Sequence, residues 1–482
     1  MKIDTLMSTS GVGFGTSGAR GTVEAMTDPV CYAYTRGFLQ AMQAQALTDA
    51  GAPVYLAGDL RPSTGRILAA VARAVADSGF RPVYTGRLPS PAVAVYAMQQ
   101  GAASIMVTGS HIPDDRNGIK FNRPDGEILK ADEALIREQD VALPDPFPAI
   151  GPDALPPPDA AARDAYVARY VGFFGRQSLA GLKVGVYQHS GVARDLLVEI
   201  LTGLGAQTTA LARSDTFIPV DTEAIRAEDV RLGREWAAQH AFDAIVSTDG
   251  DADRPLLADE RGEWLRGDVV GVLCAHFLGI RTLVTPVSSN TVVEASGWFR
   301  AVHRTRIGSP FVIERMQAAL TENAGSVAGY EANGGFLLAS DIVLDGRTLT
   351  ALPTRDALLP MLAILAAARQ QGCTVSRLVA ALPPHYTASD RLKNFPTAIA
   401  RQKIEELAAS PAAIEAMFGA LCGPLRGTDR TDGLRLTFEN GEIVHLRPSG
   451  NAPELRCYNE AGAPDRVQAL NRACMERLAA WI

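Results

Sequence analysis

An alternation of strand, helix and strand recurs three times along this chain of 482 residues and constrains its fold more than any other feature. Each repeat consists of a short apolar run, a helical stretch and a second apolar run. Strands that alternate with helices in this way are typical of βαβ units in parallel or mixed sheets. The predicted strand, helix and strand lie at 54–57, 63–78 and 82–84, at 182–187, 192–204 and 207–211, and at 282–287, 290–298 and 301–305.

The C-terminal part of the chain has a different pattern. Predicted strands at 434–438 and 442–446 flank Glu439-Asn440-Gly441, where the Asn-Gly pair predicts a hairpin with a type I′ turn. A strand at 454–458 and a helix at 464–481 follow. This order of elements predicts an α+β domain.

A proline-rich linker separates the first unit from the rest. Seven prolines lie between residues 143 and 158, and proline disfavours both helix and central strand. The predicted fold class is therefore α/β, with three related βαβ-type mixed-sheet domains plus a C-terminal α+β domain. The predicted domains are 1–155, 156–260, 261–375 and 376–482.

Charge and apolar content narrow the class of protein. The formal net charge of −7 argues against a general nucleic-acid partner, which usually requires a basic patch. The longest apolar run, 357–368, is shorter than the roughly 20 residues of a membrane-spanning helix. The N-terminus lacks a basic region followed by an apolar stretch, and the six cysteines form no Cys-x-x-Cys pair. We therefore expect a cytoplasmic protein with buried thiols and no membrane partner.

The most informative segment is the acidic loop Asp249-Gly-Asp251-Ala-Asp253-Arg254, which follows an apolar strand. Carboxylates this close repel one another by about 1 kcal/mol per pair at about 4 Å in water. A divalent cation bound between them makes the electrostatic energy of the cluster favourable. An all-oxygen ligand set favours Mg²⁺ over zinc. A solvated acidic turn is the alternative interpretation. An EF-hand calcium loop is a second alternative. Counted from Asp249 as position 1, Glu260 falls at position 12 as that motif requires, but Arg254 occupies position 6, where the motif needs glycine.

A second segment, Thr108-Gly-Ser110-His111-Ile-Pro113, follows the apolar run 102–107 and is called the serine loop here. A serine at the end of a strand, next to a glycine and a histidine, suits a nucleophile or a phosphate carrier. From these six residues alone, an ordinary serine-rich turn is equally plausible. Lys120, one of only six lysines, lies shortly downstream and can offset charge or act as an acid or base.

Three further polar segments are rich in glycine. Segment 15–21 contains Arg20 and could let backbone amides and a guanidinium approach an anion. The sugar loop, Glu331-Ala-Asn333-Gly-Gly335, offers a carboxylate and an amide that suit vicinal hydroxyls. The phosphate loop, Arg447-Pro-Ser449-Gly450-Asn451, together with Arg456 suits a phosphate dianion. A plain turn is the alternative for the sugar loop and for the phosphate loop. A Gly-x-Gly-x-x-Gly string at 13–18 overlaps segment 15–21, but no strand is predicted before it, as a dinucleotide-binding site would require.

Together, the five segments resemble the motifs of the α-D-phosphohexomutases, in the order and spacing of that family. The resemblance covers almost the whole chain and implies four domains around a central cleft, each contributing a loop. It implies that Ser110 carries a phosphoryl group. It further implies that Asp249, Asp251 and Asp253, with one phosphoserine oxygen, hold Mg²⁺.

The resemblance also implies the reaction. The phosphoryl group passes from Ser110 to a sugar monophosphate, and the resulting hexose 1,6-bisphosphate, which also acts as activator, turns over before its other phosphate returns to the serine. Lys120 is the candidate general acid or base, with His111 and Arg20 as helpers. The implied substrate-binding residues are Arg254, Gly308, Glu331, Asn333, Arg447, Ser449, Gly450, Asn451 and Arg456.

The sugar loop bears on the preferred hexose. It keeps Glu331 but has Asn333 and Gly335 where many bacterial relatives have serine and histidine. A similar string occurs in N-acetylglucosamine-phosphate mutases and in a branch of bacterial phosphomannomutases. We expect a mutase that interconverts mannose 6-phosphate and mannose 1-phosphate for nucleotide-sugar and polysaccharide synthesis.

Several alternatives remain open at this point. Glucose, glucosamine or N-acetylglucosamine phosphates could be substrates through the same mechanism. A metal-dependent sugar phosphatase and a non-catalytic sugar-phosphate binder are more distant alternatives. The intact serine, the three acids and Lys120 argue against a binder, and the sugar and phosphate loops argue against a simple hydrolase. We expect a monomer or a weak homodimer.

Overall fold

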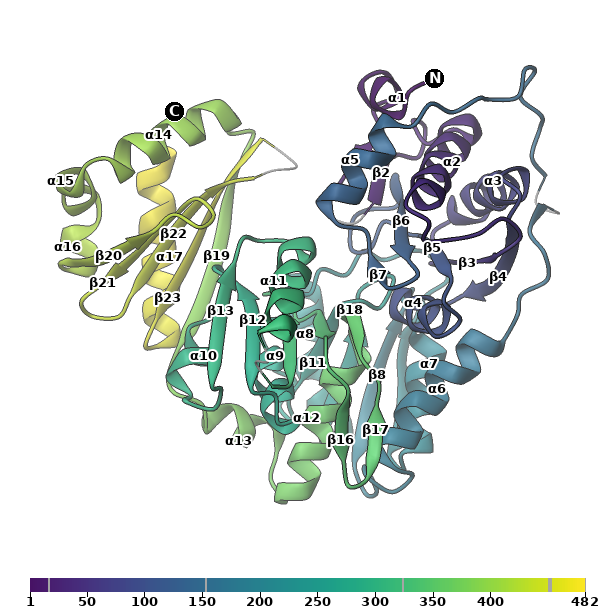
Figure 1. Ribbon diagram of the computed structural model, residues 1–482. Helices are drawn as coiled ribbons and strands as arrows, with labels where there is room; N and C mark the ends of the chain where they lie inside the picture. The colour runs from purple at the N-terminus through teal and green to yellow at the C-terminus, as the bar shows by residue number, and fades with distance from the viewer. Residues whose placement is uncertain (16–17, 152–153, 323–324, 450–452, 482) are drawn as a thin grey trace.

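Four main sheets follow one another along an arc, with the N-terminal and C-terminal parts of the chain at its two ends (Figure 1). The computed structural model describes residues 1–15, 18–151, 154–322, 325–449 and 453–481. The α/β class predicted from the sequence is confirmed, with three mixed sheets followed by an antiparallel one. The boundaries between the four domains, near residues 155, 260 and 375, remain our proposal.

The first sheet has seven strands in the order β1-β2-β6-β5-β3-β4, with β7 paired to β6. The predicted strand–helix–strand unit is confirmed as β3, α3 and β4, and β3 is parallel to both β4 and β5. The elements are α1 (Ile3–Ser10), β1 (Gly13–Phe14), β2 (Gly18–Thr22), α2 (Asp28–Ala44), β3 (Pro53–Gly58), α3 (Thr64–Asp77), β4 (Arg81–Arg87), α4 (Ser90–Gln99), β5 (Ala103–Val107), β6 (Arg116–Arg123), β7 (Gly126–Glu127) and α5 (Lys130–Glu138).

The second sheet has four strands in the order β11-β10-β8-β9. The predicted unit is confirmed as β8, α7 and β9, and β10 runs parallel to β8 and antiparallel to β11. Its elements are α6 (Ala161–Phe174), β8 (Lys183–His189), α7 (Arg194–Gly203), β9 (Gln207–Arg213), α8 (Ala227–His240), β10 (Ala244–Thr248) and β11 (Pro255–Ala258).

The third sheet has five strands in the order β13-β12-β14-β15-β18, and β16 and β17 form a separate hairpin. Its elements are α9 (Gly267–Phe277), β12 (Thr282–Pro286), α10 (Val292–Ala295), β13 (Ala301–Thr305), α11 (Ser309–Thr321), β14 (Val327–Tyr330), β15 (Phe336–Leu338), β16 (Ile342–Leu344), β17 (Arg347–Leu349), β18 (Leu352–Asp356), α12 (Leu358–Gln371) and α13 (Val375–Ala380).

The fourth sheet is antiparallel, in the order β19-β23-β22-β21-β20, as an α+β domain requires. Its elements are β19 (Tyr386–Lys393), α14 (Thr397–Ala408), α15 (Pro411–Ile414), the π-helical turn η2 (Glu415–Gly419), α16 (Ala420–Cys422), β20 (Leu425–Asp429), β21 (Leu434–Phe438), β22 (Ile443–Pro448), β23 (Glu454–Ala461) and α17 (Pro464–Ala479).

The helix predicted at 290–298 is wrong in length, because α10 is a single turn. Asn290 Oδ1 accepts the backbone N–H of Val292 at 2.8 Å, which fixes the start of the turn. Gly297 follows with a φ of +66°, a left-handed conformation that ends helices.

The predicted type I′ turn at the β21–β22 hairpin is also wrong. Phe438 N donates to Glu442 O, so the loop has three residues, 439–441. Gly441 has a φ of +83°, whereas Asn440 does not have a positive φ. This is the geometry of a three-residue hairpin that ends in a left-handed glycine, and a type I′ turn would need two such residues.

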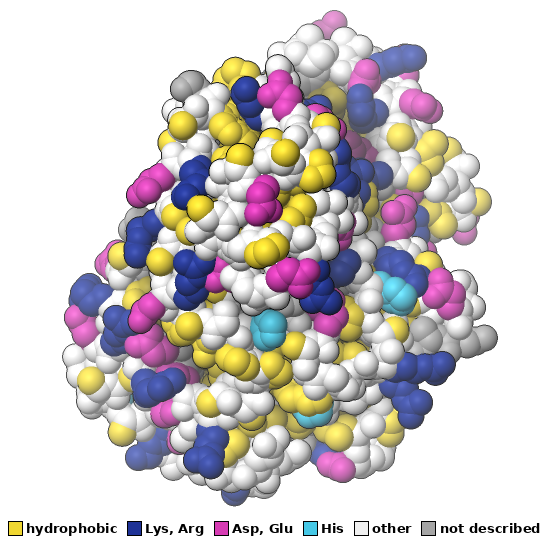
Figure 2. All heavy atoms as spheres, turned by 90° about the vertical axis from the view of Figure 1, so that its left-hand side faces the viewer, with side chains coloured by type: hydrophobic (Ala, Val, Ile, Leu, Met, Phe, Trp, Pro, Cys, Tyr) yellow, Lys and Arg dark blue, Asp and Glu magenta, His cyan; other side chains and the backbone are white. Residues whose placement is uncertain are grey.

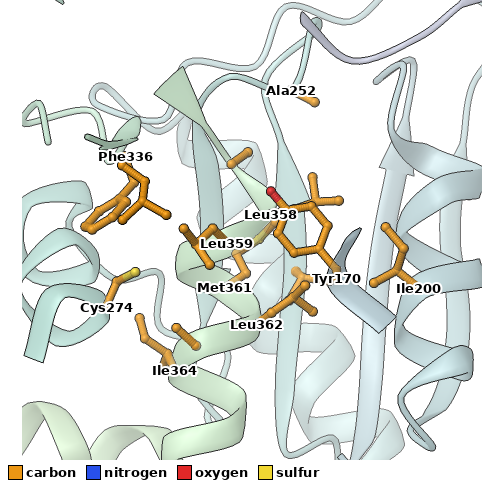
Figure 3. Packing of buried hydrophobic residues seen from close by; sticks show 14 of the residues in the cluster. Tyr170, Ile200, Ala252, Cys274, Phe336, Leu358, Leu359, Met361, Leu362 and Ile364 are labelled. Carbon is orange, nitrogen blue, oxygen red and sulfur yellow. The ribbon is translucent and has the colours of Figure 1, made fainter. Parts of the chain in front are cut away.

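The longest apolar run of the sequence forms α12, which lies in the middle of the largest hydrophobic core. In Figure 3, Leu358, Leu362 and their neighbours pack between Phe336 of β15 on one side and Tyr170 of α6 on the other. Residues from the second and third sheets therefore share one core, which fixes these two parts of the molecule against each other. Within the described part of the chain, no helix combines the length and apolar character needed to cross a bilayer.

Candidate active site

Ser110 lies directly beside the acidic loop. The serine loop follows the C-terminal end of β5, a central strand of the first sheet. Ser110 has a φ of +55° and is buried. Its Oγ donates to Asp249 Oδ2 at 2.5 Å, and its backbone N–H donates to Thr108 Oγ1 at 2.8 Å. A left-handed conformation is unusual for serine, so the surrounding contacts must hold the residue in place.

Arg61 makes most of those contacts. This buried side chain uses all five of its N–H groups, and the Nε–H donates to Asp59 Oδ2 at 3.0 Å. Asp59 Oδ2 also accepts from Thr108 Oγ1 at 2.7 Å, so the acid joins the arginine to the serine loop. The remaining four N–H groups donate to the carbonyl oxygens of Ser110, Ile112, Pro113 and Arg116, at 2.6–3.2 Å.

Two glycines allow the close approach of these segments. A Cβ on Gly109 would lie 2.6 Å from the Cζ of Arg61, where the guanidinium packs on the backbone. A Cβ on Gly250 would lie 2.7 Å from the carbonyl oxygen of Ser110. The missing side chains therefore let the serine loop sit between Arg61 and the acidic loop.

The acidic loop brings its three carboxylates together, as the sequence indicated. Asp249, Asp251 and Asp253 are all buried, and a ligand atom from each lies within 4.8 Å of the others. The loop closes on itself because Asp249 N donates to Arg254 O at 3.1 Å and Arg254 N donates to Asp249 Oδ1 at 3.2 Å. Ser90, at the start of α4, donates its N–H to Asp251 O and its Oγ to Asp251 Oδ2.

The donor set fits a hard divalent cation. Neither Asp251 Oδ1 nor Asp253 Oδ1 has a hydrogen-bond partner among the described residues. Buried carboxylate oxygens are rarely left without a partner, and here two of them lie in a cluster of three acids. Asp249, Asp251 and Asp253 could therefore hold an ion such as Mg²⁺ with oxygen ligands alone.

Charge in the cluster is partly balanced by neighbouring cations. Lys120 Nζ lies 2.6 Å from both Asp251 Oδ2 and Asp253 Oδ2. Burial opposes its charged form, but the two carboxylates outweigh burial and raise the pKa of Lys120. For Asp249, burial together with Asp251 and Asp253 raises the pKa of the carboxyl well above its usual value.

His111 lies between Ser110 and Arg254, and Arg20 is close enough to Arg254 and Asp251 to interact with them electrostatically. The Nδ1 of His111 is 3.3 Å from Ser110 Oγ and 2.9 Å from an Arg254 nitrogen. Burial and the Arg254 guanidinium lower the pKa of His111 to about 3, so the imidazole is neutral near pH 7. Burial, followed by Arg254, lowers the pKa of Arg20 to about 10, which leaves Arg20 charged.

The sugar loop lies between β14 and β15 and is joined to the acidic loop through Arg355. Arg355 Nε is 3.0 Å from Asp253 Oδ2, and Arg355 Nη1 is 3.0 Å from Glu331 Oε2. Asn333 Oδ1 accepts the N–H of Gly335 at 3.0 Å, so its amide shapes the loop. Gly308, with a φ of +131°, precedes α11.

The phosphate loop lies in the C-terminal domain, where two of its predicted residues, Gly450 and Asn451, are outside the described residues. Arg447 Nε pairs with Asp432 Oδ1 at 2.9 Å, and Asp432 Oδ2 accepts the N–H of Ile307 at 2.9 Å. Ile307 lies in the third domain, next to Gly308. Asp432 therefore links Arg447 to that domain.

The other described members of the phosphate site bond within their own domain. Arg456 lies on β23, with a nitrogen 3.3 Å from Glu454 Oε2. Ser449 is buried, and its N–H donates to Glu454 O at 2.8 Å. A pocket lies beside this domain, where it meets the second and third, and includes Ala332 of the sugar loop and Glu223 in its wall.

The sequence interpretation missed four residues that the structure places in the site: Asp59, Arg61, Ser90 and Arg355. For Asp59 and Arg61 a signal was present, because they directly follow the predicted strand 54–57 and so lie at the same sheet edge as Ser110. Arg355 lies on β18, just before the longest apolar run, and nothing in the sequence links it to the acidic loop.

Comparison with known proteins agrees with this arrangement. Four family models match in order: phosphoglucomutase/phosphomannomutase α/β/α domain I at residues 11–140, domain II at 164–262, domain III at 266–386 and the C-terminal domain at 399–477. A phosphomannomutase of Sinorhizobium fredii is 45 % identical over 459 residues, which cover 95 % of this chain and 96 % of that protein. A phosphomannomutase of Salmonella muenchen is 44 % identical over 460 residues, with 95 % and 94 % covered.

Solved structures share the fold at lower identity. A phosphoglucomutase/phosphomannomutase family protein from Burkholderia thailandensis gives a TM-score of 0.74 at 18 % identity, covering 97 % of this chain and 96 % of that one. An N-acetylphosphoglucosamine mutase from Aspergillus fumigatus gives 0.60 at 13 % identity, covering 99 % and 98 %. With four matched domains and close relatives over nearly its full length, the chain belongs to the phosphoglucomutase/phosphomannomutase family and is an enzyme of the isomerase class.

Proposed function

We propose that this enzyme is a phosphomannomutase that interconverts mannose 6-phosphate and mannose 1-phosphate through a phosphorylated Ser110. One observation carries the mechanism: Ser110 Oγ lies 2.5 Å from Asp249 within a buried cluster of three acids. The relatives of highest identity named above, both phosphomannomutases, support the choice of hexose.

In the proposed reaction, a hydroxyl oxygen of the sugar monophosphate forms a bond to the phosphorus carried by Ser110. The bond from that phosphorus to Ser110 Oγ breaks, and a hexose 1,6-bisphosphate results. After the bisphosphate turns over, its other phosphoryl group returns to Ser110 Oγ. Mg²⁺, held by Asp249, Asp251 and Asp253, would supply positive charge that offsets the charge of the transferred group.

The neighbouring side chains have separate roles in this proposal. Lys120 is held protonated by Asp251 and Asp253. Its Nζ can give a proton to Ser110 Oγ as the bond to phosphorus breaks and take up the proton of the attacking hydroxyl. Arg20 and Arg254 stay charged and stabilise the transferred phosphoryl group. Neutral His111, whose Nδ1 lies 3.3 Å from Ser110 Oγ and 2.9 Å from an Arg254 nitrogen, helps to orient these two side chains.

Recognition of the sugar falls to the sugar loop and the phosphate loop. Glu331 is positioned to accept hydrogen bonds from vicinal hydroxyls, with Asn333 holding the loop in shape. Arg447, Ser449 and Arg456 would bind the phosphate that is not being transferred.

The test is a comparison of substrates with one enzyme preparation. We expect mannose 1-phosphate to give a higher kcat/KM than glucose, glucosamine or N-acetylglucosamine 1-phosphate, in the presence of Mg²⁺ and glucose 1,6-bisphosphate. The intact mass of the purified protein should include one phosphoryl group, which Ser110→Ala removes together with the activity. A higher kcat/KM for another hexose would overturn the specificity. Steady release of inorganic phosphate in place of isomer would identify a phosphatase instead.

A further inference from the structure

Arg355 lies at the end of β18, where it contacts two loops that come from different domains. It is almost fully buried, with 4 % of its surface exposed. Its Nε and Nη2 lie 3.0 and 2.9 Å from Asp253 Oδ2 of the acidic loop. Its Nη1 lies 3.0 Å from Glu331 Oε2 of the sugar loop. One guanidinium therefore joins an acid proposed to hold the cation to the carboxylate proposed to recognise the sugar.

The contact with Asp253 uses only one oxygen of that carboxylate. Oδ2 receives Arg355 and also Lys120, whose Nζ is 2.6 Å away. Oδ1 has no hydrogen-bond partner within the part of the chain that is described, and Arg254 Nε is 3.6 Å from it. Arg355 thus fixes the rotation of the carboxylate while Oδ1 remains available to a cation.

Arg355 is itself held on a rigid base. The next residue, Asp356, accepts from the hydroxyl of Tyr166 at 2.8 Å and from the first turn of α12 at Leu358 N, at 2.9 Å. Arg355 Nη1 also donates to Ser309 Oγ at 3.2 Å, and Ser309 Oγ donates to Glu127 Oε2. The guanidinium is therefore placed by elements of all three N-terminal domains.

We propose that Arg355 is a positioning residue that couples the acidic loop to the sugar loop, so that the proposed cation and the sugar hydroxyls meet groups oriented by the same side chain. This inference rests on the proposed function. Only a planar fork can bind Asp253 through two nitrogens and still reach Glu331, and a lysine provides one point charge. A shift of one loop must then shift the other, which links the affinity for cation with the affinity for sugar.

The principal test uses Arg355→Lys, which keeps the charge and removes the fork. We expect the affinity for Mn²⁺, a spectroscopic substitute for Mg²⁺ measured by electron paramagnetic resonance, to fall about tenfold, as when other groups that orient metal ligands are lost. The KM for mannose 1-phosphate should also rise about tenfold. Glu331→Gln should raise KM to a similar extent but lower the Mn²⁺ affinity less than Arg355→Lys does, because Asp253 keeps its contacts with Arg355.

The double variant shows whether the two residues act together. If Arg355 acts through Glu331, Arg355→Lys with Glu331→Gln should raise KM no further than the more damaging single change. If the KM of the double variant rises by the product of the two single effects, the proposed coupling is overturned. A folded Arg355→Lys enzyme with the wild-type Mn²⁺ affinity and KM would overturn the proposal as a whole.

Arg304→Lys is the matched control. Arg304 is another arginine of the third domain, paired with Glu294 at 2.8 Å, and its other hydrogen bonds go to backbone carbonyls at 286–290, outside both loops. The Arg304→Lys change should lower thermal stability without changing the Mn²⁺ affinity. If Arg355→Lys unfolds while Arg304→Lys does not, the milder Ser309→Ala, which removes one contact of the guanidinium, takes its place. We expect Ser309→Ala to raise KM by about threefold, and an unchanged KM would overturn the proposal.

The two proposals fail in different ways. A wild-type enzyme that isomerises no hexose phosphate would refute the proposed function. The Mn²⁺ affinities of the wild type and Arg355→Lys would still decide whether Arg355 positions the acidic loop.

Discussion

At the scale of single residues, the site is defined by how each carboxylate divides its two oxygens. Asp251 and Asp253 each use Oδ2 for hydrogen bonds within the protein and leave Oδ1 without a partner in the described residues. Lys120 contacts both Oδ2 atoms, so the protein's own cation already offsets part of the repulsion among the acids. The protein's own contacts therefore hold these carboxylates in place, and a metal ion would need only the remaining oxygens.

Removing one of these oxygens tests the assignment of the metal site. Asp251→Asn deletes a charge and one ligand oxygen with little change in shape. We expect the affinity for Mg²⁺ to fall at least tenfold and kcat to fall with it, measured by titration calorimetry and by activity as a function of Mg²⁺. Asp259→Asn is the control, because Asp259 is another buried acid of the second domain and bonds Arg261 at 2.6 Å instead of the cluster. An Asp251→Asn enzyme with wild-type Mg²⁺ dependence would refute the assignment.

At the scale of elements, the serine loop owes its shape to a side chain that precedes it by nearly fifty residues. The loop has few backbone hydrogen bonds of its own, and four of its neighbouring carbonyls are satisfied by Arg61. Asp59 balances the buried charge of Arg61 at 3.0 Å and is itself fixed by Thr64 of α3, whose hydroxyl donates to it at 2.7 Å. The connection between β3 and α3, which contains Asp59 and Arg61, thus stabilises the serine loop that follows β5.

Arg61→Lys should therefore damage both stability and the first step of the reaction. A lysine can keep one contact with Asp59 but leaves several buried carbonyls without donors, so we expect a loss of about 2–4 kcal/mol in the free energy of unfolding. Phosphorylation of Ser110 by glucose 1,6-bisphosphate should also slow. Denaturant unfolding and intact mass over time measure the two effects.

Arg73→Lys, on the helix α3 that follows Arg61, provides the comparison. Arg73 forms an exposed pair with Asp77 at 2.8 Å, and such pairs contribute less than about 1 kcal/mol. Equal losses of stability from the two changes would contradict the role given to Arg61.

At the scale of the whole molecule, the C-terminal sheet lies at one end of the arc (Figure 1) and is linked to the third domain by polar contacts. Glu460 of β23 accepts the N–H of Thr291 at 3.0 Å, and Asp432 accepts the N–H of Ile307 at 2.9 Å. Figure 2 shows the face of the molecule on which the C-terminal domain lies. Basic and acidic side chains are interspersed over that face, and neither kind gathers into one patch. A joint of this kind allows the domain to move as the bisphosphate turns over.

Asp432→Asn should loosen this joint and the phosphate loop together, because the asparagine amide cannot accept from both Ile307 N and Arg447 Nε. We expect KM for mannose 1-phosphate to rise about tenfold, with a smaller change in kcat. The radius of gyration from small-angle X-ray scattering should increase. Asp390→Asn, an exposed position on β19 of the same domain, should change neither quantity. An unchanged KM and radius in Asp432→Asn would show that the contact has no part in domain closure.

Most elements and the metal loop were predictable from local sequence. The βαβ units around β3, β8 and β12 follow from apolar periods and turn residues, which act over a few positions. The two errors, the length of α10 and the turn at Gly441, concern short segments, where a single side-chain cap or a single backbone angle decides the outcome. Asp249, Asp251 and Asp253 could be singled out because closely spaced carboxylates after a buried strand repel one another, which favours a bound cation over a solvated turn.

The sequence by itself determined the order of the elements, the three acids, the serine that faces them and the family. Only the tertiary structure showed that Arg61 holds the serine loop and that Arg355 joins the acidic loop to the sugar loop. The physical reason is distance along the chain: local patterns report on neighbours within a few turns, whereas a buried arginine takes its partners from whichever strands and loops the packed core brings around it.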